Sequence, residues 1–371
     1  MLSFIVGNIK VLFLIVMSII SLGILVAIHE FGHFFFAKLF GVRTPSFSIG
    51  MGGPVLWSKK IGDTQFQISA IPFGGYLEIA GLAEVGQGEQ QEALATDSGS
   101  FQVKPYWQKV LIMSGGVLFN FLTGTIIFIG LFYAGMPKTP FYGAETARPV
   151  INKTVDGTIA RQLQLQAGDE IVAINDINTP NITVLIKTLQ QNASKPIAIR
   201  VKRAEQLLPF TATLDKNGRL GIEFKAEYFP RYGFFESIKQ AITATGTIIH
   251  GVWNAVVAIF TKHAINNIAS PLIIVSYFVT NAGQGIAVLL CFLAFISINL
   301  AVFNLIPLPI ADGGQITFIT IETVIGRQIP EKIRNGIHVA TWILVLALSA
   351  YLIAKDAIML AWPKIKMLLK L

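Results

Sequence analysis

Residues 11–37 read VLFLIVMSIISLGILVAIHEFGHFFFA, and this stretch decides the fold class of the chain. Its first part, Val11 to Ile28, contains no charged residue. A helix of about 20 apolar residues is long enough to cross a bilayer. The apolar run is also longer than the 7–15 residues that are typical of a signal peptide. Residues 1–40 therefore predict a transmembrane segment whose later part carries the polar motif His29-Glu30-Phe31-Gly32-His33.

Three further runs without charged residues follow, at 110–136, 264–311 and 335–354. Charged residues make up only 13% of the 371 residues, which is about half of their share in soluble domains. The run at 264–311 covers 48 positions (264 through 311) and would be about 72 Å long as one helix, so it must contain more than one element. We predict a polytopic α-helical membrane protein with transmembrane segments at 1–40, 109–136, 285–314 and 335–358.

Residues 234–283 permit two interpretations. The part from Ala241 to Thr261 is apolar enough to span the membrane, but it also holds several threonines, His250 and Asn254. These polar groups favour an amphipathic helix that lies in the membrane interface or re-enters from it. We predict an amphipathic or re-entrant segment, with a true span as the alternative.

Two stretches have the composition of water-exposed chain. Residues 83–100, AEVGQGEQQEALATDSGS, form a polar connector within the loop at 41–108. Residues 144–225 show short apolar alternations separated by turn residues, which predict a folded α+β domain. A basic tail occupies 359–371.

The charge balance is basic, with 29 Lys and Arg against 21 Asp and Glu. The basic residues flank apolar runs, so we expect the lipid bilayer, and no nucleic acid, as the anionic partner. The single cysteine, Cys291, excludes an intramolecular disulfide framework and a cysteine-rich zinc fold.

The polar motif in the first span indicates a metal site. Two histidines four residues apart lie on one face of a helix, so that His29 and His33 can reach the same ion. Glu30 can then accept a proton from an attacking water. Ionisable groups within an apolar span cost several kcal/mol unless they are paired or bound to metal, which argues against an accidental spacing.

A third ligand is needed, and Asp312 is the best candidate. It ends the uncharged run at 264–311, so it is a further carboxylate at membrane depth. Pro307 and Pro309 break the helix before it, and an irregular backbone within a membrane is tolerated where it lines a cavity. The alternative is that Asp312 only caps a helix at the water boundary.

These motifs resemble the site-2 protease family of intramembrane zinc metalloproteases, peptidase family M50, and most closely its bacterial branch of regulators of sigma E. The resemblance rests on residues 29–33 and on Asn304 to Gly314, NLIPLPIADGG. Phe73 to Tyr76, FGGY, resembles the membrane-associated β-loop of the family, and the segment at 167–175 resembles a bacterial PDZ domain. Ser114-Gly115-Gly116 departs from the usual Ala-Gly-Pro, which leaves the metal chemistry untouched.

The resemblance implies a four-helix transmembrane core with a membrane-associated β-loop and one inserted PDZ-like α+β domain. It implies a zinc ion held by His29, His33 and Asp312, with Glu30 as the catalytic residue. Contacts to the substrate or the transition state would come from Asn304, Asn299, Gly74, Gly75 and Tyr76. For the asparagines the alternative is a polar contact between helices, and for the loop it is an ordinary surface hairpin.

The resemblance also implies substrates and an orientation. The expected substrates are single-span membrane proteins, such as pre-cleaved anti-sigma factors in a stress response, or remnant signal peptides. The chain would lie in the bacterial cytoplasmic (inner) membrane, with the active site towards the cytoplasm and the PDZ-like domain outside it. Two other functions stay open from the residues: a metal-binding transporter, and a non-catalytic scaffold that presents its PDZ-like domain to partners.

Overall fold

The computed structural model describes residues 2–71, 74–82, 92, 94–261, 274–275, 277–279 and 285–368. Much of the predicted connector, the later part of the segment at 234–283 and the end of the basic tail lie outside the described residues. The chain forms two compact units, of which one comprises Met1–Ile127 with Thr245–Leu371 and the other Phe128–Ala244.

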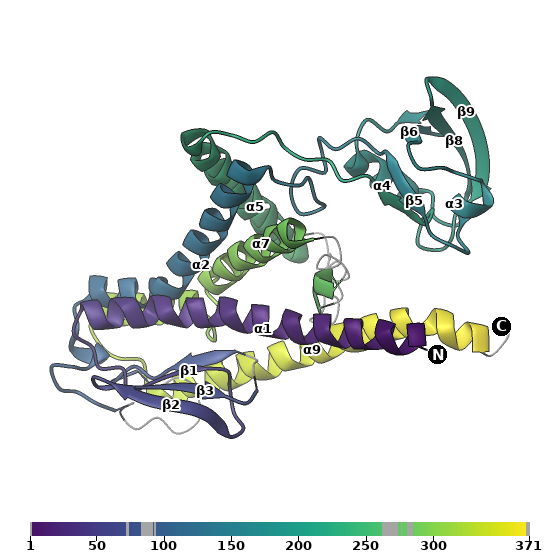
Figure 1. The fold of residues 1–371 in the computed structure, drawn as a ribbon. Coiled ribbons are helices and arrows are strands. Elements are labelled where there is room, and N and C mark those ends of the chain that lie inside the picture. Colours follow the sequence, from purple (N-terminus) through teal and green to yellow (C-terminus); the bar gives the residue numbers. More distant parts are fainter. Residues whose placement is uncertain are drawn as a thin grey trace. The chain divides into compact units, whose positions relative to one another are not determined.

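Long helices dominate the first unit (Figure 1). In chain order they are α1 (Leu2–Leu39), α2 (Tyr106–Ala134), α5 (Phe234–Thr261), α7 (Ile286–Leu305), α8 (Asp312–Ile325) and α9 (Glu331–Leu368), with a short 3-10 helix η1 (Phe101–Val103) before α2. The boundary between the units falls within α2 and within α5.

Within the described residues, five helices are long and apolar enough to cross a membrane. They are Leu12–Leu39, Tyr106–Ala134, Phe234–Ala258, Ile286–Leu305 and Lys332–Ile358. This confirms a polytopic membrane protein. The four predicted spans are among the five, and the additional one is α5, the least apolar of the set. Length and composition do not distinguish a spanning helix from an interfacial one, so the four-helix core and the re-entrant segment stay predictions.

A small sheet follows α1 and lies beside it (Figure 1). Its strands are β1 (Ser46–Ile49), β2 (Val55–Ile61), β3 (Thr64–Ser69) and β4 (Gly75–Leu77), in the spatial order β2-β3-β1-β4. Only the β1–β3 pair is parallel. Phe34 of α1 packs edge-on against Phe47 and Phe66 of the sheet, with ring centroids 5.7 and 5.6 Å apart. The predicted loop at 41–108 thus contains a sheet that is anchored next to residues 29–33.

Small residues let α1 and α2 approach closely. A side-chain carbon on Gly32 would overlap the backbone of Gly115, and one on Gly115 would overlap the backbone of Gly32. Helices in lipid gain most from such contacts, since lipid competes well for larger apolar side chains. This contact places the middle of α2 beside the polar motif of α1.

The break after α7 is caused by the two prolines. The helix ends at Leu305, and Pro307 and Pro309 supply no backbone N–H to continue it. The chain then turns and starts α8 at Asp312. Gly313 would overlap the carbonyl of Leu305 if it carried a side chain, so the turn folds tightly onto the end of α7.

The second unit contains an α+β domain with an apolar core. Its elements are β5 (Ile151–Thr154), α3 (Ile159–Gln162), β6 (Glu170–Ile174), β7 (Ile177–Asn178), α4 (Ile182–Gln191), β8 (Pro196–Arg203), β9 (Gln206–Thr213) and β10 (Ile222–Phe224). One antiparallel sheet has the order β7-β6-β8-β9, and β5 pairs with β10 in another. The PDZ-like assignment of this domain stays a prediction.

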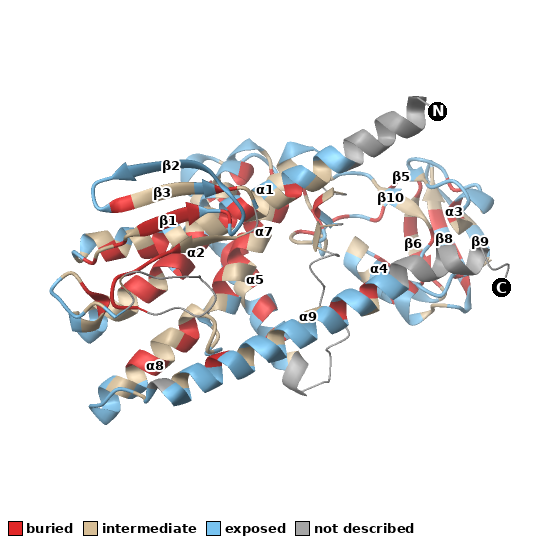
Figure 2. Ribbon diagram, turned by 90° about the horizontal axis from the view of Figure 1, so that it is seen from below, coloured by how far each residue is buried: buried red, intermediate tan, exposed pale blue. Residues whose placement is uncertain are grey.

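Burial differs between the elements (Figure 2). Buried residues of the α+β domain gather on β6, β8 and the inner face of α4. The helix α9 is largely exposed along its span. Exposed apolar helix surface is the expected surface of a protein that lipid surrounds.

Candidate metal centre

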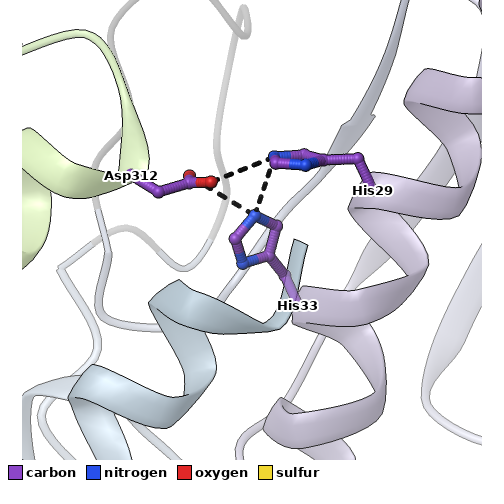
Figure 3. Close-up of side chains that lie close together, drawn as sticks. All are labelled: His29, His33 and Asp312. Carbon is purple, nitrogen blue, oxygen red and sulfur yellow. Dashed lines mark hydrogen bonds and ion pairs between the residues drawn. The ribbon is translucent and has the colours of Figure 1, made fainter. Parts of the chain in front are cut away.

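Three predicted ligands meet at one point of the first unit (Figure 3). His29 and His33 project from α1, and Asp312 projects from the first turn of α8. The Nε2 atoms of the two histidines are 3.2 Å apart. One carboxylate oxygen of Asp312 lies 3.1 Å from Nε2 of His29, and the other lies 3.4 Å from Nε2 of His33. Asp312 follows His33 by 279 positions in the sequence (312 minus 33), yet both side chains belong to one site.

The donor set fits a zinc ion. Zinc takes nitrogen and oxygen ligands at about 2.0–2.2 Å in a tetrahedron, which places the ligand atoms about 3.3 Å from one another. The separations of 3.1 to 3.4 Å between the three donor residues match that spacing. If neither Nε2 atom carries a proton, the two lone pairs face each other at 3.2 Å and repel, and a cation between them removes this repulsion. The site is buried, with His29 and His33 only 7% and 5% exposed.

The helix α2 encloses the two imidazoles from the other side. A side-chain carbon on Gly116 would come within 2.5 Å of ring atoms of His29 and His33. Glycine is thus the residue that leaves room for both rings. The backbone carbonyl of Ile112, one turn earlier, accepts a hydrogen bond from Nδ1 of His33 at 2.8 Å. Both contacts orient the rings so that their Nε2 atoms point at Asp312.

Asn120 of α2 also contacts one of the two histidine rings. Its side-chain amide nitrogen lies 3.1 Å from Nδ1 of His29. Ser297 of α7 donates a hydrogen bond of 2.8 Å to the backbone carbonyl of Asn120. Both Asn120 and Ser297 are fully buried. The sequence reasoning gave Asn120 no role, although a glycine and an asparagine one helical turn apart, at 116 and 120, are a signal that could have been followed.

Glu30 lies next to the edge of the small sheet. It is partly buried, and its Cγ would be 3.7 Å from a side-chain carbon built on Gly75 of β4. Among the described residues, β4 pairs with β1 on one side and with no other strand. The proposed base and the free edge of this strand are therefore neighbours.

The other predicted site residues occupy different positions. The amide nitrogen of Asn304 lies 3.3 Å from Nε2 of His29, so Asn304 belongs to the same cluster. Asn299 instead donates to the carbonyl of Phe295 on its own helix at 2.7 Å. Tyr76 accepts a hydrogen bond of 3.3 Å from Ser46. Gly74 takes a positive φ of 77° where the chain turns into β4.

A cavity of about 70 Å³ opens beside Asp312. It is lined by Met113, Ile310, Ala311, Asp312, Gln315, His338 and Trp342. His338 of α9, which the sequence leaves as an isolated histidine, is buried here and packs on the ring of Phe318. The cavity gives small molecules access to the carboxylate of Asp312.

A multi-pass membrane protein with a buried pair of histidines, a carboxylate and an adjacent glutamate has the composition of a membrane metallopeptidase. The sequence profile of peptidase family M50 matches residues 17–348. The match covers most of the chain, which therefore belongs to peptidase family M50.

Relatives match over nearly their whole lengths. A Clostridium perfringens protein provisionally named as a zinc metalloprotease is 29% identical over 93% of this chain and 98% of its own length. A similarly named protein of Vibrio cholerae is 28% identical over 91% of this chain and 97% of its own. The regulator of sigma E protease of Haemophilus influenzae is 24% identical over 91% and 97%.

These comparisons confirm the family resemblance and the predicted class of enzyme, a metallopeptidase. The names of the relatives agree with zinc as the cofactor. The roles of the individual residues stay predictions.

Proposed function

We propose that this chain is an intramembrane zinc peptidase that hydrolyses a peptide bond in or near the transmembrane segment of single-span membrane proteins. One observation carries the proposal. His29, His33 and Asp312 converge from α1 and α8 with the spacing of a zinc site, and Glu30 follows His29 directly on α1. The arrangement is that of a hydrolytic centre with three protein ligands and one open position.

The chemistry divides between the metal and the chain. Zinc in such a site polarises a carbonyl and makes water more acidic. Glu30 takes a proton from the attacking water and passes it to the leaving amine, so that the carboxylate ends as it began. Asn304, whose amide lies 3.3 Å from Nε2 of His29, is placed to donate a hydrogen bond to the oxygen that gains charge.

Substrate binding uses the free edge of β4 in this proposal. A helical substrate hides its peptide bonds, so it must unwind before it is cut. An unwound segment can add as a strand to β4, at Gly75 and Tyr76. Gly74 forms the turn before this strand, and its carbonyl accepts a hydrogen bond of 3.0 Å from the backbone of Gly50. Glu30 is the neighbour of Gly75, so a strand bound there lies at the base. Asn299, bonded within its own helix, contributes to the packing of α7 rather than to this contact.

The orientation follows from the parity of the crossings. The motif at 29–33 lies late in α1, and Asn304 and Asp312 lie at and after the end of α7. Both helices must therefore enter from the same side to share the site. With one crossing by α2 between them, α5 either stays in the interface or is followed by a further crossing. We favour the interfacial α5, which puts the metal and residues 144–225 at opposite faces of the membrane. The family resemblance then assigns the metal to the cytoplasmic face and residues 144–225 to the outside of the bacterial inner membrane.

The domain at 144–225 acts as a PDZ-like filter in this proposal. It binds the ends of shortened chains or excludes bulky outer domains. The substrates are then pre-cleaved anti-sigma factors, as in a stress response, or remnant signal peptides. The relative named as a regulator of sigma E protease supports this class of substrate.

The test combines metal analysis with cleavage of a membrane-embedded reporter by the purified chain in detergent. We expect His33→Ala and Asp312→Ala to lose zinc and activity. Glu30→Gln should keep zinc and lose about 10²–10⁴-fold in rate, because only the proton carrier is removed. His250→Ala is the control, since His250 is exposed on α5 and contacts Asn254 instead of the cluster.

Four outcomes would contradict the proposal. Normal cleavage by Glu30→Gln would remove the general base, and zinc flux in proteoliposomes that survives this substitution would favour a transporter. Full zinc occupancy in Asp312→Ala would remove the third ligand. A scaffold would be favoured if the full chain shows no cleavage and deletion of residues 144–225 abolishes binding to its partners.

A further inference from the structure

Asn120 has a buried oxygen that the surrounding chain does not satisfy. Its side chain is fully buried in the middle of α2, between α1 and α7. The amide nitrogen faces Nδ1 of His29 at 3.1 Å, whereas the amide oxygen has no hydrogen-bond partner among the described residues. A buried polar atom without a partner destabilises the folded state, so this arrangement calls for an explanation.

The explanation lies in the protonation of His29. A histidine whose Nε2 lone pair points at a metal carries its proton on Nδ1. Nδ1 of His29 is then a donor and cannot accept from an amide NH₂ group. The oxygen and nitrogen of an asparagine amide have nearly the same shape, and a half-turn of the amide exchanges them. After this turn the oxygen accepts the Nδ1–H of His29, and the unsatisfied atom disappears.

His33 shows the same arrangement with a different acceptor. Its Nδ1 lies 2.8 Å from the backbone carbonyl of Ile112, which can only accept a hydrogen bond. The proton of His33 is therefore on Nδ1, and its Nε2 lone pair faces Asp312. Two histidines that point their Nε2 atoms at one carboxylate from the same helix need matching tautomers, and α2 supplies an acceptor to each.

The position of Asn120 is itself held in place. Ser297 of α7 donates to its backbone carbonyl at 2.8 Å, and Ser297 is fully buried. The same helix α7 leads to Asn304, whose amide reaches His29. Asn120 thus joins the helix that carries both histidines to the helix that precedes Asp312.

We propose that Asn120 is a positioning residue for the metal centre, and that its side-chain oxygen accepts the Nδ1–H of His29. This hydrogen bond fixes the tautomer and the ring orientation that direct Nε2 at the ion. Partners of this kind behind a ligand typically contribute 10–100-fold to metal affinity. The inference rests on the ligand role of His29 in the proposed function.

The experiment measures the zinc affinity of the purified full-length chain in detergent, by competition with a chromophoric chelator. We expect Asn120→Ala and Asn120→Leu to bind zinc about 10–100-fold more weakly. Asn120→Asp keeps an acceptor oxygen of the same size and should stay within about threefold of wild type. Asn120→Leu keeps most of the packing volume, so it separates the lost acceptor from a cavity.

The matched control is Thr125→Val, one turn further along α2. Thr125 also makes a polar contact between helices, with its hydroxyl 3.1 Å from that of Thr245, but it contacts no ligand. A purely structural role for such contacts would weaken zinc binding in Thr125→Val and leave Asn120→Asp no better than Asn120→Leu. The proposal expects wild-type affinity in the control and rescue by aspartate.

A spectroscopic measurement adds a readout that does not depend on zinc affinity. The visible absorption of the cobalt-substituted chain reports the ligand field directly. We expect an altered band shape in Asn120→Leu and a band close to wild type in Asn120→Asp. Identical bands in all three chains would overturn the inference.

Failure of the proposed ligand set and failure of the role of Asn120 give different results. If His29→Ala binds zinc as tightly as wild type, then the proposed ligand set is wrong and the inference falls with it. If His29→Ala loses zinc while Asn120→Ala and Asn120→Leu bind normally, then the metal centre stands and only the role of Asn120 is refuted.

Discussion

The surroundings of the metal centre and the core of the α+β domain bury different kinds of residue. Around the metal centre the buried groups are histidines, Asn120, Ser297 and glycines in close backbone contact. The α+β domain buries an apolar core instead, which contains Ile151, Ala160, Leu165, Ile171, Ile174, Leu185, Leu189, Ile197, Ile199, Val201, Leu214 and Leu220. Water drives the second arrangement, because apolar area removed from it gains about 25 cal/mol per Å².

Lipid removes that driving force from the first unit. In the apolar windows of its candidate spans, between 11% and 44% of residues are buried inside the protein. The remaining apolar residues lose little by facing hydrocarbon tails. Small residues and hydrogen bonds then give helices in lipid their specific contacts, beside an apolar cluster that includes Phe47 and Met113. Replacing a small or polar residue should therefore damage the first unit most. Truncating an apolar side chain should damage the second unit most.

The largest expected effect is that of Gly116→Ala. The new methyl group would lie 2.5 Å from atoms of both histidine rings, so the rings must turn away from Asp312. We expect at least about a 100-fold loss of zinc affinity and a parallel loss of cleavage. Gly130→Ala on the same helix is the control, since nothing lies within 4 Å of its added carbon. Wild-type zinc content in Gly116→Ala would show that this contact does not constrain the rings.

A core truncation in the α+β domain should act on stability instead. Leu185 of α4 is fully buried, and Leu185→Ala should cost about 2–5 kcal/mol through the cavity it leaves. Ile186 is 39% exposed, and Ile186→Ala should cost less than about 1 kcal/mol. Amide hydrogen exchange of β6 and β8 measures both. The zinc content should be unchanged in each, because this core contains residues of the second unit alone; a loss of zinc would break the comparison.

The domain should also lose stability in acid. Burial raises the pKa of the Asp169 carboxyl, but hydrogen bonds from Arg203 at 2.7 Å and from the backbone of Gln166 at 2.8 Å outweigh it, so the pKa lies below its ordinary value. A carboxyl with a lowered pKa stabilises the folded state fully above its unfolded pKa of about 3.9.

This stabilisation is lost as the pH falls below about 4 towards the folded pKa. We therefore expect faster hydrogen exchange in β6 and β8 at pH 3 than at pH 6, after correction for the intrinsic exchange rate. Arg203→Met should weaken this dependence, since it removes the main partner of Asp169. An equal dependence in the variant would assign the acid sensitivity to other groups.

An exposed ion pair in the α+β domain should contribute least to stability. Lys153 and Glu223 lie opposite each other on β5 and β10 and form an ion pair at 3.2 Å, with both side chains more than half exposed. Such pairs contribute about 0–1 kcal/mol, because water screens them. Lys153→Ala should leave exchange in the domain within about 0.5 kcal/mol of wild type. A larger loss would mean that this strand pair depends on charge.

Much of the fold was predictable, because a charged residue is costly within lipid and is therefore rare in each spanning segment. Uncharged runs revealed the spans, and the alternation at 144–225 revealed a domain with strands. The structure adds that the helix expected within 234–283 runs without interruption from Phe234 to Thr261 and that the last helix continues to Leu368. An amphipathic helix accommodates the polar residues of such stretches on one face.

The proposed ligand set was predictable from the sequence alone, for a physical reason. His29, His33 and Asp312 are ionisable groups beside long apolar runs, and such groups are stable there only when they are paired or bound to an ion. Only the tertiary structure decides what surrounds them. The contacts of Ile112 and Asn120 with the histidine rings and the space above Gly116 depend on how closely the backbones of α1, α2 and α7 approach, and no local pattern in the chain encodes the distance between helices.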